Sequence, residues 1–144
     1  MPVDPIIVRR RLRVLERCIR ILRQLRERGR AAFLDDEIVQ DRAARNAQLA
    51  AQTCADIALH ILAASGRAAP ETYAEALTSL ARLGVIPEAL AGRLAGAVRL
   101  RNILVHGYLD VDHGRLFDEL GWIDDAAAFA AAIERSLEAC ENTK

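Results

Sequence analysis

Residues 101–108 bring together side chains that could act on a phosphodiester, and they close a predicted helix. Arg101 is a permanent cation whose planar group grips phosphate. His106 can give or take a proton near neutral pH, and the hydroxyl of Tyr108 both donates and accepts hydrogen bonds. This combination suits phosphodiester chemistry that needs no metal.

The spacing of these residues predicts their geometry. A helix turns about 100° per residue, so Asn102 and His106 share a face one turn apart, and Asn102 could hydrogen-bond the imidazole and fix its tautomer. Arg101 and His106 lie about 140° apart around a straight helix. One helix therefore cannot easily aim both at one phosphate, whereas Arg101 of one chain could meet His106 of a second, antiparallel copy. A kink at Gly107 would instead let one chain build the site alone.

Four other side chains are expected to be structural. His60 lies in an apolar stretch and is expected to be a hydrogen-bonded core histidine, and Tyr73 is expected to pack at the edge of the core. His113 is expected to face water, and Trp122 to pack at a helix junction. The chain's three histidines and three cysteines show no metal-ligand spacing, so neither a metal nor another cofactor is expected.

Composition indicates one helical domain. The chain has 144 residues, of which 52% are hydrophobic and 4% aromatic, and alanine is abundant. Cys18, Cys54 and Cys140 are far apart and are expected to be reduced. No apolar run approaches the roughly 20 residues that span a bilayer, and no secretory signal is recognised, so the expected location is the cytoplasm.

Apolar residues recur at helical spacing in five stretches. Asp4 followed by Pro5 marks a helix start, Gly29 marks its end, and Asp35 or Asp36 begins the second helix. The second helix is long enough to contain a kink. The expected helices cover residues 5–28, 35 or 36 to 65, 71–83, 87–106 and 126–140.

A loop is expected over residues 109–114, followed by one or two helical turns over 115–120. Because the connections are short, residues 1–144 are expected to form a single all-α domain. Its predicted architecture is an antiparallel up-and-down bundle of four to five helices.

Charge is divided unequally along the chain. Residues 1–30 hold ten arginines and three acidic residues, a net charge of +7, and the remaining residues carry −7. One interpretation is a solvated helix face whose arginine stems cover the core. The other is a surface that tracks phosphates or docks an acidic partner.

The pattern Arg-x4-His-x-Tyr, formed by Arg101, His106 and Tyr108, resembles the motif of HepT-type toxins, which are ribonucleases of the HEPN domain class. The resemblance extends over most of the domain, through residues 41–58, 70–76, 83–87 and 100–108. It implies an all-helical HEPN-like homodimer that cleaves RNA without a metal. It also implies a minimal nucleotidyltransferase as the antitoxin partner, and some such antitoxins transfer AMP to the motif tyrosine, here Tyr108.

The resemblance implies that this protein is the toxin of a type VII-like toxin–antitoxin pair and an endoribonuclease. His106 would act as general acid or base, Arg101 would hold the scissile phosphate, Asn102 would orient His106, and Tyr108 would contact phosphate. The alternative is a non-catalytic helical adaptor that binds a nucleotidyltransferase, which also fits the divided charge.

Overall fold

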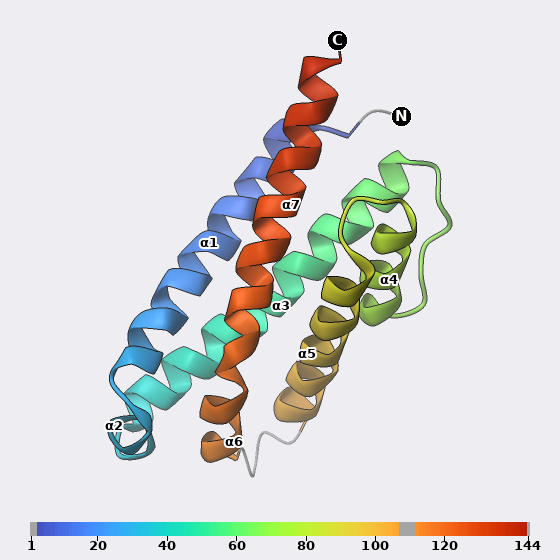
Figure 1. Ribbon diagram of the computed structural model, residues 1–144. Coiled ribbons are helices and arrows are strands. Elements are labelled where there is room, and N and C mark those ends of the chain that lie inside the picture. Colours follow the sequence, from blue (N-terminus) through green and yellow to red (C-terminus); the bar gives the residue numbers. More distant parts are fainter. Residues whose placement is uncertain (1–2, 107–111, 144) are drawn as a thin grey trace.

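The computed structural model describes residues 3–106 and 112–143, and for residues 100–106 it describes the backbone alone. Every regular element within those ranges is a helix (Figure 1). The elements are α1 (Pro5–Glu27), α2 (Arg30–Leu34), α3 (Glu37–Ala64), α4 (Tyr73–Arg82), α5 (Glu88–His106), α6 (His113–Asp118), the 3-10 helix η1 (Glu119–Gly121) and α7 (Trp122–Asn142).

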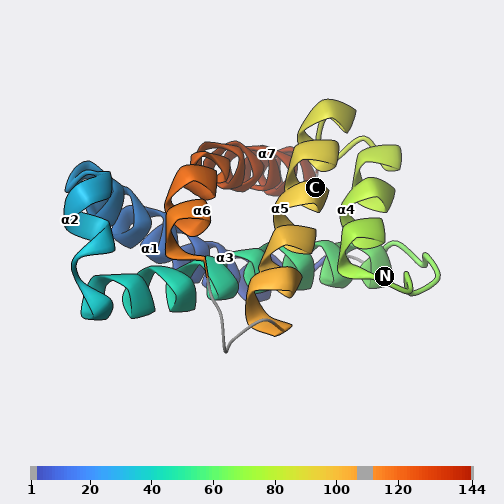
Figure 2. The same ribbon diagram turned by 90° about the horizontal axis from the view of Figure 1, so that it is seen from below.

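The four long helices alternate in direction, as the up-and-down prediction requires (Figure 1). α1 packs against α3 and α7, while α4 packs against α3 and α5. The two ends of the chain lie at one end of the bundle, and α2 and α6 lie at the other (Figure 1). Figure 2 shows α4 and α5 side by side across α3. The all-α bundle predicted from the sequence is therefore confirmed.

Polar side chains define where the helices begin. Asp4 accepts a hydrogen bond from the backbone N–H of Ile6 at 3.0 Å, and Pro5 follows it at the first helical position. Asp36 accepts hydrogen bonds from two backbone N–H groups at the start of α3. Of the two candidates, Asp35 and Asp36, the cap is therefore Asp36. α3 then continues as one helix of 28 residues. After α1, Gly29 adopts φ 89°, a conformation that favours glycine.

One hydrophobic core joins all the long helices. The predicted apolar stripe of α1 is buried, as is the predicted face of α7. Burial of such side chains contributes about 1.5–3 kcal/mol each. These two faces consist of Val8, Leu12, Leu15, Ile19 and Leu22 on α1 and Phe129, Ile133 and Leu137 on α7.

The region around α6 differs from the prediction. Helix α6 begins at His113, because the Asp112 side chain caps it by accepting from the N–H of Arg115 at 3.0 Å. The expected loop is therefore wrong for His113 and Gly114, and residues 107–111 lie outside the described residues. Helix α7 begins at Trp122 rather than after Asp124 or Asp125, because η1 leads directly into it.

Helix α2 was not predicted from the sequence, and tertiary contacts explain it. Phe33 packs against Phe117 of α6 with ring centroids 5.3 Å apart. The buried side chain of Gln40 donates to the carbonyls of Phe33 and Leu34, both at 3.0 Å. Arg30 donates to Asp118 of α6 at 3.0 Å. A five-residue helix has too few internal hydrogen bonds to persist without such contacts.

The fold brings the two oppositely charged parts of the sequence together. Arg9 on α1 donates to Glu134 on α7 at 2.9 Å and also pairs with Glu141, and these carboxylates raise the pKa of Arg9. Exposed ion pairs contribute little individually. Five of the ten arginines in residues 1–30 pair with acidic residues from later helices: Arg9, Arg11, Arg23, Arg26 and Arg30. Intramolecular pairing thus accounts for half of the basic charge, and a phosphate-tracking role for the exposed remainder stays a prediction.

All three cysteines are free, as expected. Cys18 and Cys54 are buried, and burial raises the pKa of both thiols, whereas Cys140 is exposed. In the part of the chain that the structure describes, no helix has the length and apolar character needed to cross a membrane.

Candidate functional site

Helix α5 carries three of the four motif residues in its last two turns. It runs without interruption through His106, so Arg101, Asn102 and His106 belong to one continuous helix. Helical geometry then sets Asn102 and His106 one turn apart and Arg101 about 140° away from His106. Tyr108 lies outside the described residues, as does the kink considered at Gly107.

The buried face of α5 shows where these positions stand relative to the core. Leu94 is 1% exposed, and Arg101 comes two turns later in the same register, on the side of α5 that faces the bundle. Arg99 is exposed, and His106 comes two turns after it, at the edge of that side. The motif therefore spans both the inward side and the edge of α5.

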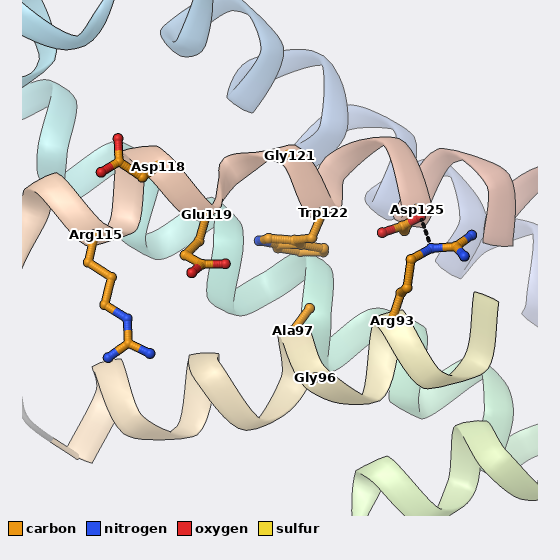
Figure 3. Close-up of a pocket in the computed structure, with 9 residues that line it drawn as sticks. All are labelled: Arg93, Gly96, Ala97, Arg115, Asp118, Glu119, Gly121, Trp122 and Asp125. Atoms are coloured by element: carbon orange, nitrogen blue, oxygen red, sulfur yellow. Dashed lines mark hydrogen bonds and ion pairs between the residues drawn. The ribbon is translucent and has the colours of Figure 1, made fainter. Parts of the chain in front are cut away.

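A pocket of about 480 Å³ lies between α5, α6, η1 and α7, next to the motif turns (Figure 3). Arg93 Nε donates to Asp125 Oδ1 at 2.8 Å across it, and Trp122 is half-buried in its lining. Arg115 extends from α6 toward the later turns of α5 (Figure 3). The lining residues are Arg93, Gly96, Ala97, Arg115, Asp118, Glu119, Gly121, Trp122 and Asp125.

Helical register joins this pocket to the motif. Ala97 lines the pocket, and Arg101 is the residue one turn later on α5, a rise of about 6 Å. Sequence reasoning placed Trp122 at a helix junction, and it does stand where η1 meets α7. It missed Arg115 and the Arg93–Asp125 pair, because periodicity within one helix does not reveal which residues of another helix face it.

Three of the remaining sequence expectations need correction. Within the described residues, His60 is half-buried and its Nε2 atom has no hydrogen-bond partner, so it is not the satisfied core histidine expected. His113 does not face water fully: the residue is half-buried, and its Nδ1 atom is buried and has no hydrogen-bond partner among the described residues. Tyr73 is 36% exposed, and its hydroxyl accepts from Gln52 at 3.1 Å, because it stands at the first, outward turn of α4.

No three His, Cys, Asp or Glu side chains among those described are grouped so that they could hold a metal ion.

Known proteins are similar to this chain in both sequence and fold. The model of the HepT-like ribonuclease family matches residues 15–140, a segment that contains the motif. The mRNA nuclease HepT of Shewanella oneidensis is 31% identical over 106 residues, which are 74% of this chain and 79% of that protein. The tRNA nuclease HepT of Aphanizomenon flos-aquae is 30% identical over 115 residues, 80% of this chain and 78% of that protein.

A solved structure agrees with these matches. The tri-AMPylated HEPN toxin of Shewanella oneidensis, in complex with MNT antitoxin, superposes with a TM-score of 0.81 and 28% identity, over 90% of this chain and 97% of that one. The order of the helices, the motif residues on α5 and the extent of the family match all point to the same family. The chain belongs to the HepT-like ribonuclease family.

Proposed function

We propose that the protein is the toxin of a type VII-like toxin–antitoxin pair and a metal-independent endoribonuclease. The observation that carries this proposal is the unbroken course of α5 through His106, which holds Arg101, Asn102 and His106 on one helix inside the segment that matches the family. The relatives named as mRNA and tRNA nucleases support RNA as the substrate class.

The chemistry follows from the motif and from RNA itself. RNA carries its own nucleophile, the 2′-hydroxyl. As this oxygen attacks the adjacent phosphorus, the bond from phosphorus to the 5′-oxygen breaks, leaving a 2′,3′-cyclic phosphate and a free 5′-hydroxyl. His106 takes the proton from the nucleophile or returns one to the leaving oxygen, and Asn102 orients it. Arg101 holds the phosphate and offsets its developing charge, and Tyr108 contacts the phosphate.

The test replaces His106 by alanine. Cleavage should fall by roughly 10²–10⁴-fold, the usual contribution of a general acid–base group, while circular dichroism shows an unchanged helical fold. His60→Gln, a change of a histidine outside the motif, is the control and should cleave normally. Wild-type protein should also cleave in excess chelator. Full activity in His106→Ala, or loss of wild-type cleavage in chelator, overturns the mechanism.

The same variant separates the toxin from a non-catalytic adaptor. A toxin loses growth inhibition in His106→Ala but still binds its nucleotidyltransferase. If the protein is an adaptor, the wild type already cleaves no RNA. Both the wild type and His106→Ala then bind the partner equally well. Pull-down and cleavage assays on the same preparations distinguish the two.

We also propose that the partner is a minimal nucleotidyltransferase that AMPylates Tyr108, as the tri-AMPylated toxin in the related complex supports. The added phosphodiester charge would repel the substrate phosphate and occupy Arg101. Co-expression should add one or more AMP units by intact mass and silence cleavage. The Tyr108→Phe variant should lack the AMP unit attached to this tyrosine. An unmodified wild-type protein beside an active partner would contradict this assignment.

A further inference from the structure

The pocket beside the motif contains the chain's single tryptophan. The indole of Trp122 lies above Ala97, between Glu119 and Asp125 (Figure 3). Below it, α5 presents the small residues Gly96 and Ala97, and a Cβ built on Gly96 would meet nothing within 4 Å. A half-buried aromatic ring beside open space is a surface on which a second flat ring can stack.

Charged groups frame this ring at both ends. Two of the three carboxylates in the lining are held by arginines: Asp125 by Arg93 at 2.8 Å and Asp118 by Arg30 at 3.0 Å. Glu119 and Arg115 supply the other charges. A carboxylate can accept hydrogen bonds from the amino groups of a base, and a guanidinium can bind a phosphate.

The location ties the pocket to the cleavage motif. Arg101 stands one turn beyond Ala97 on α5, about 6 Å along the helix. A base held against Trp122 would therefore place its own or the next phosphate at the motif turns. Arg115 extends toward the same turns from α6 (Figure 3).

We infer that the Trp122 pocket is a nucleobase subsite for single-stranded RNA, in which the indole stacks on a base next to the scissile phosphate. The inference rests on the proposed ribonuclease function and adds a substrate contact to it. The lining has three carboxylates and two guanidinium groups, which disfavours a polyanionic ligand such as a free nucleoside triphosphate. Proteins hold single-stranded nucleic acid with aromatic rings on which bases stack and with cations that contact the backbone. In this subsite Trp122 would supply the stacking, and Arg115 and the neighbouring Arg101 would supply the backbone contacts.

The first experiment measures cleavage of a single-stranded RNA. Loss of one base stack corresponds to about 5- to 150-fold, so Trp122→Ala should raise KM by that factor with kcat little changed, and Trp122→Phe should restore most of the affinity. Tyr73→Ala, which removes an exposed aromatic ring on α4, is the control and should leave KM unchanged.

Because Trp122 also packs on the core, a second pair of variants leaves it in place. Gly96→Leu fills the pocket, and Gly92→Leu makes the same change one turn earlier on α5, outside the lining. Both glycines are exposed, and a Cβ at either meets nothing within 4 Å. Only Gly96→Leu should raise KM.

A direct binding signal comes from the single tryptophan. In the His106→Ala background, a short single-stranded RNA should quench Trp122 fluorescence. The same RNA without the base that stacks on Trp122, an abasic oligonucleotide, should not. The subsite is overturned if both leucine variants have the same KM and RNA does not quench the fluorescence. Wild-type cleavage in the same assays would still support the proposed ribonuclease function. If the wild type cleaves no RNA, the proposed function fails, and quenching alone then decides whether the pocket binds a base.

Discussion

Arg101 and His106 stand about 140° apart on one helix, and that offset assigns them different surroundings. Arg101 follows the register of the buried Leu94, so its position lies on the side of α5 that faces the bundle. His106 follows the register of exposed Arg99, so its position lies at the edge of that side. The first position suits fixing a phosphate, and the second suits moving a proton.

Arg101→Lys tests whether the guanidinium shape matters beyond its charge. A lysine cannot form two parallel hydrogen bonds to one phosphate. Loss of one charge-assisted bond should lower kcat/KM by about 10- to 150-fold. Arg99→Lys, two residues earlier on the same helix, is the matched control and should cleave like the wild type. Equal activity of the two variants would reduce Arg101 to general electrostatics.

The sequence revealed the motif but not its neighbours. Arg101, Asn102, His106 and Tyr108 are close in sequence, so residue types and spacing were enough to select them. Trp122 and its pocket depend on how α6 and α7 pack against α5, and the sequence pattern of one helix does not encode that. The motif roles themselves remain predictions that the variants above test.

At the scale of single elements, helices that carry their own start signals were predicted well. α1, α3 and α4 begin at the polar caps Asp4, Asp36 and Thr72. α2 was missed because this short segment depends on contacts with α6, above all the packing of Phe33 against Phe117. The start of α6 was placed at residue 115 instead of His113, because the local cap Asp112 was not recognised.

Asp36→Ala tests the cap of the longest helix. Asp36 accepts from the N–H groups of Ile38 and Val39 at 3.0 and 3.2 Å. Its loss should lower the free energy of unfolding by about 0.5–2 kcal/mol, measured by urea denaturation. Asp35→Ala removes the adjacent exposed carboxylate, which is not the cap of α3, and should change stability by less than about 0.5 kcal/mol. Equal losses would show that charge, not capping, is responsible.

At the scale of the whole molecule, the sequence predicted the bundle and its alternating directions. It did not predict which helices are neighbours. Arg9 pairs with Glu134 and Arg30 with Asp118, contacts between residues far apart in the chain that no local pattern shows. The unbroken α5 also bears on assembly. Because the helix has no bend through His106, one chain cannot easily aim both Arg101 and His106, the groups proposed to be catalytic, at one phosphate.

We predict that the active unit is a homodimer with a site shared between the two copies. A two-fold axis can bring Arg101 of one copy to His106 of the other. Arg101→Ala and His106→Ala protomers should each be inactive and should regain part of the activity after mixing into heterodimers. Mass spectrometry verifies the mixing. A monomer at working concentration, or verified heterodimers without activity, would contradict the shared site.

The packing of α1 against α7 has a consequence for synthesis on the ribosome. At roughly 5–20 residues per second, α1 exists for on the order of ten seconds before α7 follows, and during that time its apolar face lacks the cover that α7 provides. The motif on α5 is likewise made before Trp122 and the rest of α7 can wall its pocket. For an RNA-cleaving toxin of the kind proposed, this order of translation means that the pocket beside the motif is complete only after the start of α7 has left the ribosome.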